Sequence, residues 1–174
     1  AFPDDERVAD IKIRVAKIYE ENGKLDEAAN AYKAFYTKPP SGSTLDQEYF
    51  ARGHYGQILG DQGKAREQQK LFEETIAQYD KYIAGGGEKG AHTEFVAEMM
   101  FKLAEPQLQA YVALRIEGKG KAAGRKAEDK SLHDSLNKKA KTLKEVEIMF
   151  TEVVNTGAGE WGLASLVALG RAYE

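Results

Sequence analysis

The sequence predicts an all-α fold in which about seven helices pair into stacked antiparallel hairpins. Apolar residues recur at spacings of three and four along most of the chain, the period of an amphipathic helix. Short glycine-containing links divide this pattern, and helices of this length joined by such links form hairpins. The pattern of residues 8–40 also returns in weaker form forty residues later. With 174 residues, 42% of them hydrophobic, the chain is long enough to bury a substantial core.

The first hairpin is expected at residues 8–42. Its first helix carries a single apolar stripe at helical spacing, which we expect to be its buried face: Ile11, Val15, Ile18 and Tyr19. Asn22-Gly23 ends this helix, because both residues tolerate the left-handed conformation of a C-cap. A second helix begins near Leu25. It ends before Pro39-Pro40, because a proline disfavours helix in the residue that precedes it.

The small and aromatic residues of this hairpin follow a known repeat pattern. The tetratricopeptide repeat has W-x2-L-G-x2-Y, then A-x3-F, then P, with a period of about 34 residues. The corresponding positions of this chain are Lys12, Val15, Ala16, Tyr19, Ala28, Tyr32 and Pro40. Alanines let two helix axes approach closely, and the tyrosines fill the space beside them. The chain therefore resembles the tetratricopeptide family, and the resemblance implies a right-handed superhelix of hairpins, an α-solenoid.

A second repeat is predicted over residues 44–84. Thr44 and Gln47 have the spacing of a capping box at the start of its first helix. Gly56 occupies the position of closest helix packing, whereas Gln68 replaces the small residue that the pattern expects in the second helix. We interpret this segment as a degenerate repeat with an enlarged connection.

A third, larger repeat is predicted over residues 91–157. Pro106 interrupts its first helical pattern, so either one helix kinks there or a separate helix begins at the proline. The lack of loop-forming residues beside Pro106 favours the kinked helix, expected over residues 93–117. A flexible insertion is expected at 118–130, because it contains no large apolar residue whose burial would offset its ordering entropy. A long helix then begins near Ser131.

A half repeat is predicted at residues 160–174. Leu166, Gly170 and Tyr173 reproduce the spacing of the first helix of a repeat, and the partner helix is missing. A repeat array needs polar caps at its ends. We therefore expect residues 1–174 to be one array cut from a longer protein, or the exposed half repeat to be covered by a partner or by self-association.

No residue pattern points to catalysis, a cofactor or a metal. The chain has no cysteine, which excludes a thiolate nucleophile, a Cys-ligated zinc and any disulfide. Its three histidines are far apart, and none has a ligand spacing such as H-E-x-x-H. The glycine run at 85–90 lacks the Lys and Ser or Thr of a phosphate loop. We expect a protein that is not an enzyme.

The family resemblance implies a scaffold that binds peptides or protein segments on a concave surface, with no small-molecule substrate. The positions expected to line this groove are Asp10, Ile13, Lys17, Glu20, Phe50, Gln57 and Asp61. The alternative is that most of them are ordinary packing or solvated residues. The enlarged repeats and the phrase E-W-G-L-A-S-L-V-A-L-G-R-A-Y-E look most similar to bacterial cell-envelope and motility-associated members. This similarity favours the periplasm or envelope over the cytoplasm.

Basic charge is concentrated between Arg115 and Lys144. This stretch has ten Lys or Arg against four acids, a net +6 in a chain of net −3. Four of its residues are candidates for contact with an acidic surface: Lys119, Lys121, Arg125 and Lys126. An electrostatic docking module for nucleic acid or an anionic membrane is therefore the alternative function. It is not favoured, because no aromatic residue in this stretch offers a platform for base stacking.

Overall fold

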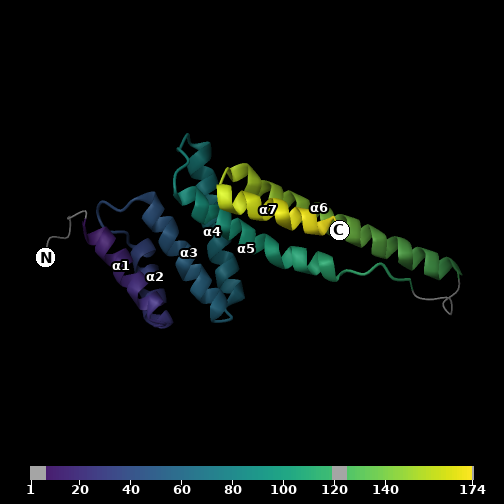
Figure 1. Ribbon diagram of the computed structural model, residues 1–174, viewed down its shortest axis with the longest axis horizontal. Coiled ribbons are helices and arrows are strands. Elements are labelled where there is room, and N and C mark those ends of the chain that lie inside the picture. The colour runs from purple at the N-terminus through teal and green to yellow at the C-terminus, as the bar shows by residue number, and fades with distance from the viewer. Residues whose placement is uncertain (1–6, 119–124, 174) are drawn as a thin grey trace. The chain divides into compact units, whose positions relative to one another are not determined.

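The computed structural model describes residues 7–118 and 125–173, which form helices and connecting segments without any strand (Figure 1). The predicted all-α class is confirmed. Seven helices lie in the described part of the chain: α1 (Arg7–Glu21), α2 (Leu25–Thr37), α3 (Leu45–Asp61), α4 (Ala65–Ala84), α5 (His92–Ala113), α6 (Arg125–Thr156) and α7 (Gly159–Ala172). The chain divides into two compact units, Ala1–Met99 and Met100–Glu174. The boundary falls inside α5, within the expected third repeat.

In the first unit, the same turn joins α1 to α2 and α3 to α4. Gly23 and Gly63 have φ of +70° and +73°. After each glycine, the backbone N–H of Lys24 or Lys64 donates to the carbonyl five residues earlier, at 2.9 Å and 2.8 Å respectively. This is the Schellman arrangement, which needs a left-handed residue and so favours glycine. The period of forty residues seen in the sequence is therefore present in the backbone.

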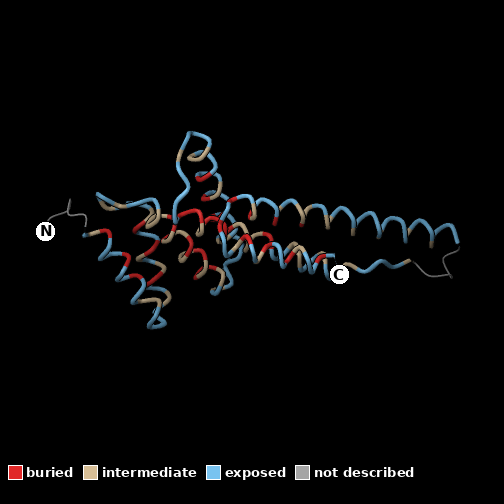
Figure 2. Tube along the Cα trace, turned by 45° about the horizontal axis from the view of Figure 1, so that its top comes forward, coloured by how far each residue is buried: buried red, intermediate tan, exposed pale blue. Residues whose placement is uncertain are grey.

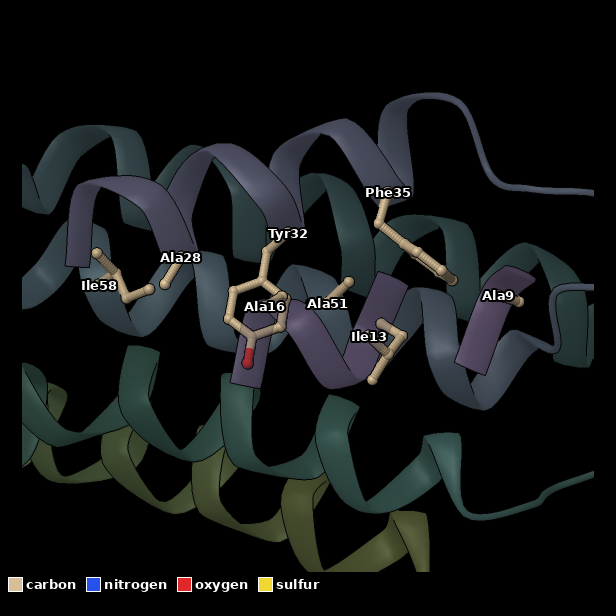
Figure 3. Packing of buried hydrophobic residues seen from close by; sticks show 8 residues of the cluster. All are labelled: Ala9, Ile13, Ala16, Ala28, Tyr32, Phe35, Ala51 and Ile58. Carbon is tan, nitrogen blue, oxygen red and sulfur yellow. The ribbon is translucent and has the colours of Figure 1, made fainter. Parts of the chain in front are cut away.

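The core of the first unit joins α1, α2 and α3 (Figure 3). Its buried members are Ala9, Ile13, Ala16, Ala28, Tyr32, Phe35, Ala51 and Ile58. The two large aromatic side chains come from α2, and α1 contributes mostly alanines. Small residues on one helix leave room for rings from the next, which lets both pack at interior density.

The buried face predicted for α1 was wrong except at Tyr19, which is partly buried against the core cluster. Ile11, Val15 and Ile18 are exposed, and the buried face carries Ala9 and Ala16 with Ile13. The helix has apolar residues on two opposite sides. The side that faces the rings of α2 is the one with small residues, because large side chains there would collide with those rings.

The unexpected Gln68 is explained by its partner on α3. A Cβ added at Gly60 would lie 2.6 Å from Nε2 of Gln68, so the long side chain occupies the space that a side chain at residue 60 would take. Forty residues earlier, the two positions hold Glu20 and Ala28. In the first hairpin the first helix carries the large residue, Glu20, and in the second hairpin the second helix carries it, Gln68.

One helix start and one helix end in this unit are formed by the residues predicted to form them. Thr44 caps α3, since its Oγ1 accepts from the Gln47 N–H at 3.2 Å and the Gln47 side chain accepts from the Thr44 N–H at 3.0 Å. Helix α2 ends at Thr37, before Pro39-Pro40. These signals act within a few residues, so the sequence alone was enough to predict them.

The helices around the expected insertion have different bounds from those predicted. Helix α5 is continuous through Pro106 but ends at Ala113, four residues before the predicted end. Just after this end, Nζ of Lys139 donates to the Leu114 carbonyl at 3.0 Å. Helix α6 begins at Arg125, six residues before the predicted start, because R-K-A-E-D-K is rich in helix formers. The predicted bounds of the insertion, 118–130, are therefore too wide, because residues 125–130 belong to α6. Residues 119–124 lie outside the described part.

The second unit packs the later part of α5 against α6 and α7. Its buried cluster consists of Ala104, Val146, Phe150, Ala168 and Ala172. Phe101 lies at its edge, with its ring centroid 5.3 Å from those of both Phe150 and Trp161. Helix α6 is buried toward its C-terminal end, at Val146, Phe150 and Val153, whereas Leu132 and Leu136 in the N-terminal half are exposed. Figure 2 shows the N-terminal part of this long helix mainly in the colour of exposed residues.

The close contact between Gly56 and Phe72 gives the first prediction. A Cβ at Gly56 would lie closer than 3.0 Å to ring carbons of the buried Phe72, so Gly56→Ala should destabilise the fold by about 1–3 kcal/mol. The control is Gly53→Ala on the same helix, where a Cβ would meet only the Met99 methyl at 3.5 Å. That change should be neutral or stabilising by up to about 1 kcal/mol. Urea unfolding measures both, and equal effects of the two changes would contradict the packing argument.

Candidate functional site

The candidate site is a surface of the first unit to which α1, α3 and the start of α5 contribute. Side-chain contacts link five of its members: Lys17, Glu20, Phe50, His54 and Phe95. The bonded pair Gln57–Glu98 lies one helical turn further along α3 and α5 and completes the set. We call this set the α1–α3–α5 face. Apart from the exposed Lys17, each of these residues is partly buried, so the face has an ordered base that remains accessible to solvent.

Aromatic rings form the centre of this face. The ring centroid of Phe50 lies 4.0 Å from that of His54 and 5.4 Å from that of Phe95, and the two phenylalanines meet edge to face. Nζ of Lys17 lies 4.4 Å from the Phe50 centroid, within the range of a cation–π interaction. The centre is therefore apolar, with one positive charge above it.

Glu20 organises the side of the face that borders the core. Its Oε2 accepts a hydrogen bond from the Tyr32 hydroxyl at 2.7 Å and lies 2.8 Å from Nδ1 of His54. Tyr32 is fully buried, so this bond ties the face to the core cluster. Burial, and then the hydrogen bond to the Glu20 carboxylate, raise the pKa of Tyr32. The carboxylate thus holds the His54 ring against Phe50 and Tyr32.

Four of the seven predicted groove residues come together on this face: Lys17, Glu20, Phe50 and Gln57. Nε2 of Gln57 donates to Glu98 at 2.6 Å and so joins α3 to α5.

The other three predicted residues lie elsewhere. Ile13 is a core residue, because its side of α1 packs against the rings of α2, so its placement in a groove was wrong. Asp10 is exposed and accepts from Gln47 Nε2 at 2.6 Å, near the start of α3. Asp61 is exposed at the last position of α3.

Sequence reasoning missed the residues that α5 contributes, Phe95 and Glu98. The connection between α4 and α5 contains the glycine run at 85–90, so Phe95 follows Phe50 by 45 residues and not by the period of 40. A search for aromatic residues in each first helix, without a fixed period, would have found Phe95.

A separate cleft of about 310 Å³ lies between α2, α3 and α4. Its aromatic wall contains Tyr36 and Tyr55, whose ring centroids are 5.8 Å apart, and Cζ of Arg52 lies 4.7 Å from the Tyr36 centroid. Lys70 and Glu74 at its edge form an exposed ion pair of 3.8 Å. Burial raises the pKa of Tyr36, although its ring borders an open cleft. The mixture of charges around this cleft does not select a ligand class.

A buried histidine joins α3 to α5. Asp46 Oδ1 lies 2.8 Å from Nδ1 of His92 and also accepts the His92 backbone N–H at 2.8 Å. The rings of Tyr49, Tyr79 and Tyr82 surround it at 5.6–5.8 Å between centroids. The rings enclose the His92 side chain, whereas the Asp46 side chain is 47% exposed, and the contact joins the start of α3 to the start of α5. Among residues 7–118 and 125–173, no three His, Asp or Glu converge to hold a metal ion.

The predicted basic segment is only partly described. Lys119 and Lys121 lie outside the described residues, and Arg125 and Lys126 are exposed in the first turn of α6. Helix α6 has seven Lys or Arg and six acids, so its own net charge is only +1. Lys139 is engaged locally, since its Nζ binds the Leu114 carbonyl and lies 5.2 Å from the Tyr111 ring centroid. The described helix is therefore of mixed charge.

We compared the chain with protein-family models, with curated proteins and with solved structures, and it matches none of them. Within the described residues, none of the helices combines the length and the hydropathy needed to cross a membrane. The features that bear on function are therefore those of the α1–α3–α5 face.

The Tyr32–Glu20 contact gives a pH-dependent prediction. An unfolded tyrosine loses its proton near pH ~10. Because the pKa of Tyr32 is raised in the fold, the unfolded chain binds fewer protons above that pH, and stability should fall as pH rises. Urea unfolding at several pH values should show a shallower alkaline loss in Tyr32→Phe than in the wild type. At neutral pH this variant should be less stable by about 1–2 kcal/mol, because it lacks the hydrogen bond.

A second variant separates the two causes of this pKa shift. Glu20→Gln removes the charge but leaves Tyr32 buried, and burial is the larger cause. Most of the alkaline loss should therefore remain in Glu20→Gln. An alkaline loss that is the same in the wild type and Tyr32→Phe would show that Tyr32 does not titrate as proposed.

Proposed function

We propose that this protein is a non-catalytic interaction scaffold whose α1–α3–α5 face binds a peptide or a protein segment. The observation that carries the proposal is the Phe50–Phe95 pair, an accessible apolar centre surrounded by charged and amide side chains. Protein interfaces concentrate their binding energy on a few aromatic or arginine side chains within a polar rim. The rings are already held by packing and by the Glu20–His54 contact, so binding would cost little of their conformational entropy.

The chemistry of the rim suggests what the bound segment carries. Glu20 contacts the His54 ring that lies against Phe50, Glu98 lies one helical turn from Phe95, and Lys17 lies over the Phe50 ring. A segment with an apolar side chain for the Phe50–Phe95 pair and a basic side chain near it would complement this surface. Nδ1 of His54 contacts Glu20 and its ring lies against Phe50, an arrangement that supports a structural role for this histidine and not a catalytic one.

We also propose that the hairpins are of the tetratricopeptide kind. The repeated Schellman turns at Gly23 and Gly63 and the close packing at Ala16 and Gly56 support this assignment. In such an array the first helices of successive hairpins share one surface, as the contacts between α1, α3 and α5 indicate here. The electrostatic alternative has less support, because α6 mixes both signs of charge.

The experiment uses a displayed peptide library as the probe, followed by calorimetric titration of the selected peptides. Phe50→Ala should weaken binding at least about tenfold, because it removes the ring at the centre of the face. Ile11→Ala, on the opposite side of α1, should leave the affinity unchanged and is the matched control. Circular dichroism verifies that each variant keeps its helix content.

The same peptides test the electrostatic alternative. Joint replacement of Arg125 and Lys126 by alanine should not change their affinity, and the dependence on salt should be shallow. A steep salt dependence that vanishes in this variant, with Phe50→Ala binding normally, would replace the proposed function by the electrostatic one.

A further inference from the structure

The outer face of α7 is an apolar surface that no described part of the chain covers. Leu163 is 66% exposed, Leu166 is 54% exposed and Val167 is 51% exposed. The opposite side of the helix is the buried one and carries Gly162, Ser165, Ala168 and Ala172. Three adjacent large aliphatic side chains on one helix face are typical of an interaction surface, not of a solvated one.

Gly170 makes this face suitable for close helix packing. A Cβ at Gly170 would meet nothing within 4 Å, so the backbone is open to approach from outside. The equivalent positions of the first unit are Ala16, which is fully buried, and Gly56, which lies under the Phe72 ring. At those two positions another helix supplies the covering residues, whereas at Gly170 no residue of 7–118 or 125–173 does.

Charges along the edge of this face favour one arrangement. Glu160 in the first turn and Arg171 in the last turn are both exposed and are eleven residues apart. Eleven residues make about three helical turns, so both lie on the same edge of α7. When two such helices pair antiparallel about the midpoint between residues 165 and 166, each Glu160 meets the Arg171 of the other helix. A parallel pairing would place the two charged edges on opposite sides of the interface and would form no such pair.

We propose that a second copy of this chain covers the face, with the two α7 helices antiparallel about a twofold axis. The pairing buries Leu163, Leu166 and Val167 of both copies, and the chains approach at Gly170. It forms two symmetric Glu160–Arg171 ion pairs. Such isologous dimers are the commonest form of protein self-association. The inference does not depend on the proposed function, because it concerns a different surface in the second unit.

Sedimentation equilibrium of the full chain tests the dimer. Arg171→Glu alone should weaken dimerisation at least about tenfold, because it sets like charges together twice. The double reversal Glu160→Arg with Arg171→Glu should restore the wild-type dissociation constant. Leu166→Glu should give a monomer with unchanged helix content, and Ile11→Glu is the control on an exposed apolar face of the first unit. A monomeric wild type, no rescue by the double reversal, or a loss of dimer in Ile11→Glu would each overturn the proposal.

Disulfide trapping tests the direction of pairing. Because the sequence has no cysteine, only the introduced cysteines can form a disulfide. In the antiparallel arrangement two copies of Leu166→Cys meet near the axis and should form a linked dimer on oxidation. Two copies of Glu160→Cys would lie about 16 Å apart along the helices and should not link. Efficient linking of Glu160→Cys would contradict the antiparallel arrangement and would overturn the proposed symmetry.

Discussion

The first unit depends on the pairing of large and small side chains where its helices meet. Phe72 lies where Gly56 has no Cβ, and Gln68 lies where Gly60 has none. Close-packed interiors tolerate little change in volume, so each such pair fixes how the facing helices approach. Both pairs join α3 to α4. Helix α3 also carries Phe50 and His54, which contact Phe95 of α5 and Glu20 of α1, so the same helix supports the hairpin and the candidate face.

Local chemistry explains what could be predicted from the sequence. The turns at Gly23 and Gly63, the Thr44 cap and the end of α2 before Pro39 each depend on residues a few positions apart. The buried face of α1 does not. Its helix has apolar residues on two sides, and periodicity cannot tell which side meets α2. The choice depends on the rings that α2 supplies, which is a tertiary property.

The candidate site was predictable to the same extent. Lys17 and Gln57 lie forty residues apart, at the same position in the first helix of the two hairpins, and Glu20 and Phe50 lie on the same two helices. Ile13 shares their spacing but belongs to the core, since it faces the rings of α2. Phe95 was missed because the glycine-rich connection changes the period. A fixed period can locate residues only where the connections between repeats are of equal length.

One packing position is occupied in different ways in the two units. In α1 and α3 the small residues Ala16 and Gly56 are covered by the next helix of the chain, which completes a hairpin. In α7, Gly170, Leu163 and Leu166 are exposed, and the opposite side of the helix packs into the second unit. This apolar side of α7 has no partner among the described residues. A surface built for helix packing lowers its free energy when a helix covers it. The opposed charges of Glu160 and Arg171 make a second α7 a helix that fits.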